Sequence, residues 1–180
     1  MRSINNGVGE WGGTLPILAN ESALRSDMVR SLHRWWLDKS ADDIPDRADL
    51  DPADWRRLLP CLFIADVERE PFRIRYRLMG TRAAEATGLD ITGRYLDELM
   101  PAGIEEPWQE HYRHSYLTRR PVLGVCHAPI VGGSHFSYEF GLFPLRKGGA
   151  AVEQFVAVED YFDLTSTLLE LVEWRAPACS

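Results

Sequence analysis

The segment FRIRYRLMGT, residues 72–81, alternates apolar and charged side chains strictly over most of its length. Phe72, Ile74, Tyr76 and Leu78 are separated by three arginines. Because successive side chains of a β-strand point to opposite faces, this pattern predicts a strand with one buried face and one solvated face. Such a strand needs partner strands beside it and other elements over its buried face, which constrains the rest of the chain.

Four other segments are predicted to be strands: CLFIADVE, PVLGVCHAPI, SHFSYEFGLFPLR and AVEQFVAVEDY. The first ends four residues before Phe72, so these two strands are expected to pair as a hairpin. The apolar run from Cys61 to Ala65, and FVAV in the last strand, do not alternate, which is typical of strands buried on both faces. These two strands are therefore expected at the centre of the sheet, with the arginine-bearing strand at an edge.

Apolar residues at helical spacing predict an amphipathic helix over residues 22–39. A polar loop follows, and Asp51 with Pro52 then indicates the start of a short helix, PADWRRLL. Between the second and third strands, TRAAEATG and EEPWQEHYRHSYLTRR are predicted to be helices and YLDELM a short turn. A last amphipathic helix is expected in DLTSTLLELVEW.

These elements divide the chain into four consecutive parts. We expect a loose arm at residues 1–19, flanking helices at 20–59, a core that contains the sheet at 60–161, and a helix with a tail at 162–180. Two strands, a helical crossover and three further strands form an α+β pattern built on one sheet.

The composition, with 45% hydrophobic and 26% charged residues, is ordinary for a soluble globular domain of 180 residues. A net charge of -7 argues against nucleic acid or an anionic membrane as the partner. Three cysteines without a C-x-x-C pair suggest neither a disulfide framework nor a zinc site. No apolar stretch is long enough for a membrane span, and the N-terminus lacks the apolar region of a signal peptide. We therefore expect a cytoplasmic protein.

Three blocks of the sequence resemble the PAS domain: IPDRADLDPADWRRLLPCLFIADVE, FRIRYRLMGTRAAEATGLDITGRYLDEL and FGLFPLRKGGAAVEQFVAVEDY. The strand that ends in Gly-Thr, with a later Thr-Gly-Arg, is similar to a short stand-alone PAS-like family common in alphaproteobacteria. The resemblance implies a five-stranded antiparallel sheet in the order 2-1-5-4-3, with the middle helices over one face. In PAS domains the space between sheet and helices holds a small ligand, a haem, a flavin or only side chains.

The side chains expected to line that space lie on the predicted strands and on the long middle helix. Trp108, Tyr112 and Tyr116 form an aromatic stripe along this helix. Core packing is the simpler explanation of the stripe, although a ligand pocket would use the same residues. The candidates for a ligand-binding surface are Tyr76, Leu78, Trp108, Tyr112, Tyr116, Cys126, Tyr138 and Phe140.

The three arginines of the solvated face, Arg73, Arg75 and Arg77, allow two interpretations. An anion site would need them to converge, which a flat edge strand does not provide by itself. A solvated edge would pair them with acids such as Glu68 and would discourage edge-to-edge association. We favour the solvated edge.

His111 and His114 lie one helical turn apart and could provide half of a metal site or a haem ligand. No further ligand is fixed by the sequence, so a surface position is the simpler interpretation and no cofactor is assigned. Photoactive flavin-binding PAS proteins carry a cysteine in an Asn-Cys-Arg motif, whereas no cysteine lies between Cys61 and Cys126 here. Neither a G-x-S-x-G elbow nor a glycine-rich phosphate loop occurs, so we do not expect an enzyme.

Trp35 and Trp36, with Leu32 on the same predicted helix, need cover from the back of the sheet or from a second subunit. We take these residues as candidates for a homodimer interface. The leading hypothesis is a stand-alone sensory or interaction module in signal transduction, which binds an unidentified small molecule, a partner signalling protein, or both. A haem or metal sensor built on His111 or His114 is the first alternative, and a small enzyme that reuses the PAS cavity is the last.

Overall fold

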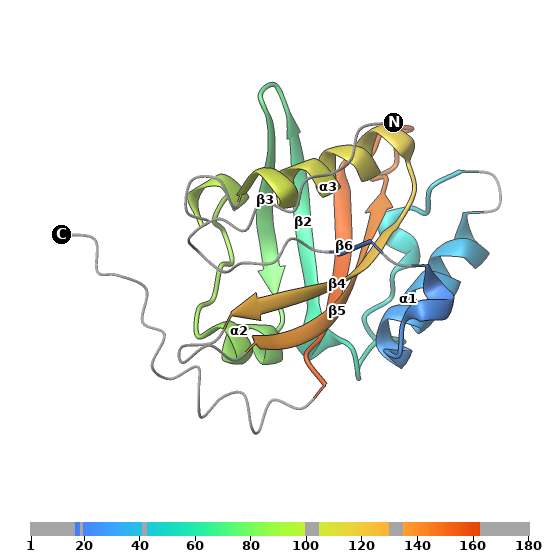
Figure 1. Ribbon diagram of the computed structural model, residues 1–180. Coiled ribbons are helices and arrows are strands. Elements are labelled where there is room, and N and C mark those ends of the chain that lie inside the picture. Colours follow the sequence, from blue (N-terminus) through green and yellow to red (C-terminus); the bar gives the residue numbers. More distant parts are fainter. Residues whose placement is uncertain (1–16, 19, 41–42, 100–104, 130–134, 163–180) are drawn as a thin grey trace, which may run out of the picture.

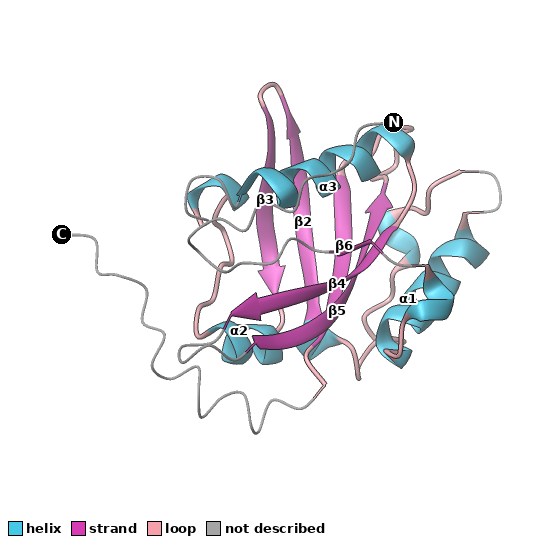
Figure 2. Ribbon diagram, viewed as in Figure 1, coloured by secondary structure: helices cyan, strands magenta, loops and turns pink. Residues whose placement is uncertain are grey.

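A computed structural model of the chain describes residues 17–18, 20–40, 43–99, 105–129 and 135–162. In these ranges helices pack around one antiparallel sheet (Figures 1 and 2). The predicted helix DLTSTLLELVEW and most of the predicted N-terminal arm lie outside the described residues.

The strands of the sheet are β1 (Ile17–Leu18), β2 (Leu62–Arg69), β3 (Phe72–Met79), β4 (Val122–Pro129), β5 (His135–Leu145) and β6 (Gln154–Asp160). Their order is β1-β4-β5-β6-β2-β3, and every neighbouring pair is antiparallel. Strands β2 to β6 take the predicted order 2-1-5-4-3, and the arginine-bearing strand β3 is at an edge, as predicted. β1 belongs to the segment predicted as a loose arm, and it adds a short strand beside β4.

The α-helices of the described residues are α1 (Asp27–Lys39), α2 (Thr81–Thr87) and α3 (Glu105–Thr118). Short 3-10 helices are η1 (Glu21–Ala23), η2 (Arg47–Asp49), η3 (Leu59–Cys61) and η4 (Leu96–Glu98). α2 ends at Gly88, whose φ of 69° is a left-handed conformation that glycine adopts without strain. The prediction of a helix at PADWRRLL is wrong, because residues 52–58 form successive turns instead. The carboxylate of Asp51 accepts the amide of Ala53 at 2.8 Å where these turns begin.

α1 begins at Asp27, later than the periodicity of the sequence predicts. The Oγ of Ser26 accepts the amide of Val29 at 3.1 Å and so caps the helix. The amides of Arg25 and Ser26, which a longer helix would include, each donate to the carboxylate of Glu139 on β5 at 2.8 Å. This contact between distant parts of the chain sets the start of α1 and ties the helix to the sheet.

Adjacent residues of β5 show that α1 and α3 cover opposite faces of the sheet. The ring of Phe140 contacts Trp108 of α3, with ring centroids 4.9 Å apart. Gly141 points to the other face, where an added Cβ would lie 3.0 Å from a methyl carbon of Val29 on α1. The same Cβ would lie 2.6 Å from the ring of Phe143, so a side chain at residue 141 would crowd both this ring and α1.

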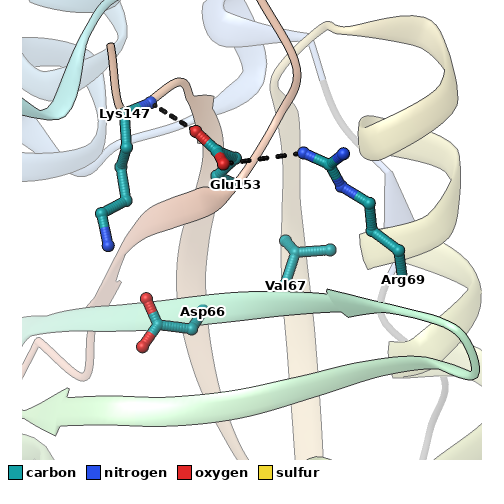
Figure 3. A pocket seen from close by; sticks show the side chains of 5 residues that line it. All are labelled: Asp66, Val67, Arg69, Lys147 and Glu153. Carbon is teal, nitrogen blue, oxygen red and sulfur yellow. Dashed lines mark hydrogen bonds and ion pairs between the residues drawn. The ribbon is translucent and has the colours of Figure 1, made fainter. Parts of the chain in front are cut away.

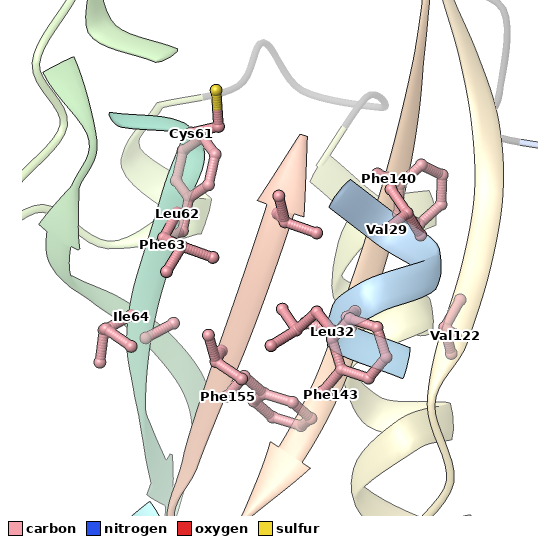
Figure 4. Close-up of a cluster of buried hydrophobic side chains, with 14 of the residues drawn as sticks. Val29, Leu32, Cys61, Leu62, Phe63, Ile64, Val122, Phe140, Phe143 and Phe155 are labelled. Carbon is pink, nitrogen blue, oxygen red and sulfur yellow. The ribbon is translucent and has the colours of Figure 1, made fainter. Parts of the chain in front are cut away.

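The sheet face under α1 is closed to solvent by apolar side chains (Figure 4). Val29 and Leu32 of α1 and Phe143 of β5 each have a relative exposure of 0%. Val156 and Val158, which point to this face from the central strand β6, also have an exposure of 0%. These side chains form a hydrophobic core under α1.

The tryptophan pair of α1 is covered mainly by its own chain. Trp36 is 1% exposed, and its indole Nε1 donates to the carbonyl oxygen of Pro144 at 2.9 Å. Trp35 is partly buried and meets Trp55 edge-on, with ring centroids 5.8 Å apart. The prediction that Leu32 and Trp36 form a subunit interface is wrong, because the back of the sheet buries both side chains.

The aromatic stripe of α3 packs on the other face of the sheet, where the helix crosses the strands (Figure 1). Tyr112 meets Phe155 of β6 edge-on at 5.1 Å between ring centroids, and Tyr116 lies 5.3 Å from the ring of Phe72 on β3. Trp108 completes the stripe through its contact with β5. The predicted packing of this stripe against the core is confirmed.

A bulge near the end of β3 changes which side chains of the opening segment face inward. Ala65 pairs with Tyr76 and Ile64 with Leu78, so Arg77 is an extra residue on β3. The alternation is shifted after this point, which leaves Leu78 45% exposed and buries Met79 at 8%. The prediction that Leu78 lines an interior surface is therefore wrong.

The arginines of β3 are held by local partners and do not converge on a shared anion site. Arg73 donates to the carboxylate of Asp97 at 2.7 and 2.8 Å, and Arg77 lies 3.6 Å from the carboxylate of Asp66. The predicted partner Glu68 instead accepts the hydroxyl of Tyr95 at 2.6 Å. The charged-edge interpretation agrees with this arrangement, but the predicted partner of the arginines was wrong. The reason is that the segment after α2 returns to β3, where the amide of Tyr76 donates to the carbonyl of residue 94 at 2.9 Å, and brings its own acidic side chains to the arginines.

Candidate functional site

A group of polar side chains lies on the sheet face under α3, between the aromatic contacts. Glu159 of β6 points to this face because it pairs with Phe140, which contacts α3. Tyr138 lies two residues before Phe140 on β5 and pairs with Cys126 of β4. We call the following residues the interior polar cluster: Tyr76 of β3, Tyr112 of α3, Cys126 of β4, Tyr138 of β5, Glu159 of β6, and Tyr161, which follows β6.

Glu159 is the ionisable centre of this cluster. Burial raises the pKa of its carboxyl group to about 7, and a hydrogen bond donated by the hydroxyl of Tyr161 lowers it in part. In the part of the chain that the structure describes, no basic side chain contributes to this pKa. The carboxyl group is therefore close to half ionised near neutral pH, without a compensating cation.

The other members of the cluster are neutral at physiological pH. Burial raises the pKa of Tyr76, Tyr112, Tyr138 and Tyr161, and the negative charge of Glu159 adds to the effect in each case. Tyr76 and Tyr112 also share a side-chain hydrogen-bond interaction. These hydroxyl groups can donate to a bound molecule or accept from it.

Cys126 is a hydrogen-bonding group in this setting and not a nucleophile. Burial raises the pKa of its thiol to about 11, and a hydrogen-bond interaction with Tyr138 lowers it in part. Because the thiolate is the reactive species, a thiol with so high a pKa is chemically inert at neutral pH.

The sheet face under α3 differs from the opposite face in keeping accessible surface at the central strand. Ala157 and Glu159 of β6 and Tyr138 of β5 are all partly exposed on this face. β6 lies in the middle of the sheet, where side chains are usually buried. The neighbouring side chains Val156 and Val158, on the α1 side of the same strand, are 0% exposed. The accessible patch therefore includes two members of the interior polar cluster, Tyr138 and Glu159, and lies beside the other four, which are buried.

The structure brings together half of the residues proposed from the sequence as a ligand-binding surface. Tyr76, Tyr112, Cys126 and Tyr138 belong to the interior polar cluster. Trp108, Tyr116 and Phe140 pack between α3 and the sheet at its border, and Leu78 points away.

The residues missed by sequence reasoning are Ala157, Glu159 and Tyr161. Glu159 follows the apolar run of the last strand, where a charged residue usually indicates that the strand is leaving the core for solvent. The available signal was the alternation FVAVE, which places Phe155, Ala157 and Glu159 on one face of a strand predicted to be buried on both.

The two histidines proposed as metal or haem ligands lie in different surroundings. His111 is half-buried between the rings of Trp108 and Phe140, and its Nε2 has no hydrogen-bond partner in the described structure. Burial lowers the pKa of His111, and the nearby His114, which is exposed, lowers it further. Across the described ranges, no group of three or more histidine, cysteine, aspartate or glutamate side chains could hold a metal ion.

A groove of about 480 Å³ lies elsewhere, where β2 meets the turn between β5 and β6 (Figure 3). It is lined by Asp66, Val67, Arg69, Lys147 and Glu153. Arg69 lies 3.6 Å from Glu153, whose carboxylate also accepts the backbone amide of Lys147 at 3.2 Å. Asp66 lies 3.6 Å from Arg77, which is outside the lining.

Comparison with known proteins gives one family match. A sequence model described as PAS domain matches residues 24–158. No curated protein matches the chain. Among the described residues, no helix has the length and apolar character needed to cross a membrane.

Similar solved structures include light-oxygen-voltage domains. One was studied with a flavin analogue, is 16% identical over 67% of this chain and 90% of that chain, and has a TM-score of 0.46. The light state of the Aureochrome1 blue-light photoreceptor domain is 16% identical over 69% of this chain and 97% of that chain, with a TM-score of 0.43. An RNA-binding light-oxygen-voltage receptor is 18% identical over 74% of this chain and 40% of that chain, with a TM-score of 0.46.

Proposed function

Because the chain belongs to the PAS domain family, we propose that it is a sensory signalling module that binds a small molecule between its sheet and α3. The ligand contacts the interior polar cluster and the accessible surface of Ala157. No catalytic step is assigned to the site, because burial raises the pKa of its thiol, and because the described residues give its carboxyl group no acid or base partner other than tyrosine.

The observation that carries this proposal is the accessible patch at Ala157, Tyr138 and Glu159 in the middle of a buried sheet face. Small-molecule sites are mostly apolar and aromatic, with a few polar groups that orient the ligand. The aromatic side chains that border this patch and the polar groups within it meet that description.

The same strand offers a route from the ligand to the flanking helix. Asp160, the residue after Glu159, accepts the hydroxyl of Ser26 at 2.7 Å, and Ser26 caps α1. A ligand that prefers one of two positions of β6 would therefore shift α1 as well, which is the requirement for a signal. A partner signalling protein or a second copy of the chain would bind the altered surface.

Native mass spectrometry of the untagged protein, with an absorbance spectrum of the same sample, tests the proposal. We expect a bound mass that is released on denaturation. Ala157→Leu fills the accessible patch and should abolish the bound mass, whereas Ala53→Leu, at an exposed turn, should retain it.

Two outcomes would contradict the proposal. One is a wild-type protein with no bound mass that no compound of a broad small-molecule library stabilises against heating. The other is a haem absorbance band that is lost in His111→Ala, which would replace the proposal by the haem sensor. The same spectra report whether the protein is a dimer.

A further inference from the structure

The charge of the interior polar cluster restricts the class of ligand, provided that the proposed function holds. Glu159 is its one ionisable group near neutral pH, since burial keeps the surrounding hydroxyl and thiol groups protonated. The described residues place no arginine, lysine or histidine close enough to affect it. An anionic ligand would therefore meet a like charge in a poorly solvated site, whereas a cation would supply the missing counter-charge.

The hydrogen bonds of Glu159 point to a ligand that donates. A carboxylate offers about four acceptor positions. In the described part of the chain, the hydroxyl of Tyr161 is the one donor that binds this carboxylate. As far as the described residues go, the remaining acceptor positions are open to donors on a ligand that lies over Ala157.

Aromatic rings gather on the sheet face to which Glu159 points. The ring of Tyr138 lies 5.1 Å from that of Tyr161, and the rings of Tyr112 and Phe155 lie the same distance apart on the α3 side. Aromatic faces attract both flat rings and cations, because their faces carry partial negative charge.

We infer that the ligand is a small aromatic or heteroaromatic molecule with a basic nitrogen, and that this nitrogen, in its protonated form, binds the carboxylate of Glu159. Protonated amines, amidines and aminopyridines belong to this class. Aromatic carboxylates of the same size should bind more weakly, because they meet a like charge whenever Glu159 is ionised.

A panel of single-ring compounds matched in size tests this inference on the full-length, 15N-labelled protein. Benzylamine, benzamidine and 4-aminopyridine represent the cations, benzyl alcohol and benzamide the neutral compounds, and benzoate and phenylacetate the anions. We expect at least one cation to shift the backbone amides of residues 157–161, and the anions to leave them unchanged.

Glu159→Gln keeps the shape of the side chain and removes its charge. We expect it to weaken binding of the active cation by roughly tenfold or more, as the loss of a hydrogen bond to a charged group does. The matched control Glu85→Gln, at an exposed position of α2, should leave binding unchanged.

The wild-type protein provides a second measurement that does not depend on the folding of a variant. Glu159 must be ionised to attract a cation, so affinity for the active cation should fall as the pH is lowered from 8 to 6. Among the described residues, the titratable groups that interact with Glu159 are Cys61, Tyr76, Tyr112, Cys126, Tyr138 and Tyr161, and burial keeps all of them neutral over this range.

Three results would overturn the inference: binding of benzoate or phenylacetate at residues 157–161, binding of a cation that Glu159→Gln and pH leave unchanged, or no binding by any cation of the panel. Each of them leaves the proposed function in place if native mass spectrometry detects a ligand. The failure of the ligand class and the failure of the function are therefore separate results.

Discussion

The two glutamates at neighbouring positions of the central strands show how differently the two faces of this sheet are built. Glu139 of β5 faces α1 and is 3% exposed. Its carboxylate accepts two backbone amides from the start of α1, each at 2.8 Å, and lies 3.6 Å from the guanidinium of Arg25. Glu159 of β6 faces α3, binds the hydroxyl of Tyr161, and has a pKa raised to about 7 by burial.

This difference separates a carboxylate with a structural role from one that we propose as a binding group. A buried carboxylate stabilises a fold when amides and a cation satisfy it, and costs free energy when they do not. The face under α1 contains the carboxylate that binds amides and a cation, beside buried apolar side chains. The face under α3 contains the carboxylate that binds only a tyrosine hydroxyl among the described residues, and the accessible patch, which is where we propose that a ligand binds.

The largest predicted effect is on the α1 face. Trp36→Ala should lower the free energy of unfolding by about 3–5 kcal/mol, because it removes a buried indole and leaves a cavity. Trp108→Ala, in the stripe of α3, should cost clearly less, because that side chain is only partly buried. Urea denaturation of both variants measures the difference, and equal losses would show that both faces are packed equally well.

The second prediction concerns the pH dependence that Glu159 adds. Its folded-state pKa of about 7 lies above the ordinary value of 4.5, so the folded state favours the protonated form. The resulting stabilisation is complete below about pH 4.5 and is lost as the pH rises through 7. The free energy of unfolding of Glu159→Gln, relative to that of the wild type, should therefore rise by up to about 3 kcal/mol from pH 5 to pH 8, at about 1.4 kcal/mol per pKa unit.

Urea titrations of the wild type and Glu159→Gln at both pH values measure this gain. Glu110→Gln, at an exposed position of α3, is the matched control and should follow the wild type. A constant difference between Glu159→Gln and the wild type would mean that the carboxyl group is well solvated in the folded protein.

The third prediction applies the same substitution to the other face. Glu139→Gln should lower the free energy of unfolding by about 1–3 kcal/mol at pH 8, because it weakens the acceptor that binds the amides of Arg25 and Ser26. At this pH, Glu139→Gln should thus lower the free energy of unfolding, whereas Glu159→Gln should raise it. If both variants are destabilised, the contrast between the two carboxylates is incorrect.

Much of this fold could be predicted from short patterns. The apolar runs of β2 and β6 place both strands at the centre of the sheet, and the alternation of β3 places it at an edge. The aromatic stripe of α3 could be identified as core packing from its spacing of four residues, which places the rings on one face of the helix. These patterns depend on residues that are close together in the sequence.

The features that could not be predicted depend on residues far apart in the sequence. The bulge at Arg77 is defined by the strand opposite it, so the exposure of Leu78 cannot be deduced from β3 alone. The start of α1 depends on Glu139, more than a hundred residues away. The role of Glu159 depends on which side chains surround the end of β6, and its own segment gives no sign of them.

The smallest predicted effect tests the link between the two faces. Ser26→Ala should lower the free energy of unfolding by about 1 kcal/mol, because it removes the cap of α1. The substitution also removes the hydrogen bond to Asp160, the neighbour of Glu159. In spectra of the 15N-labelled protein, it should therefore shift the amide of Glu159, whereas the exposed control Ser31→Ala should not. An unchanged Glu159 amide would mean that the two faces, although they share β6, respond independently.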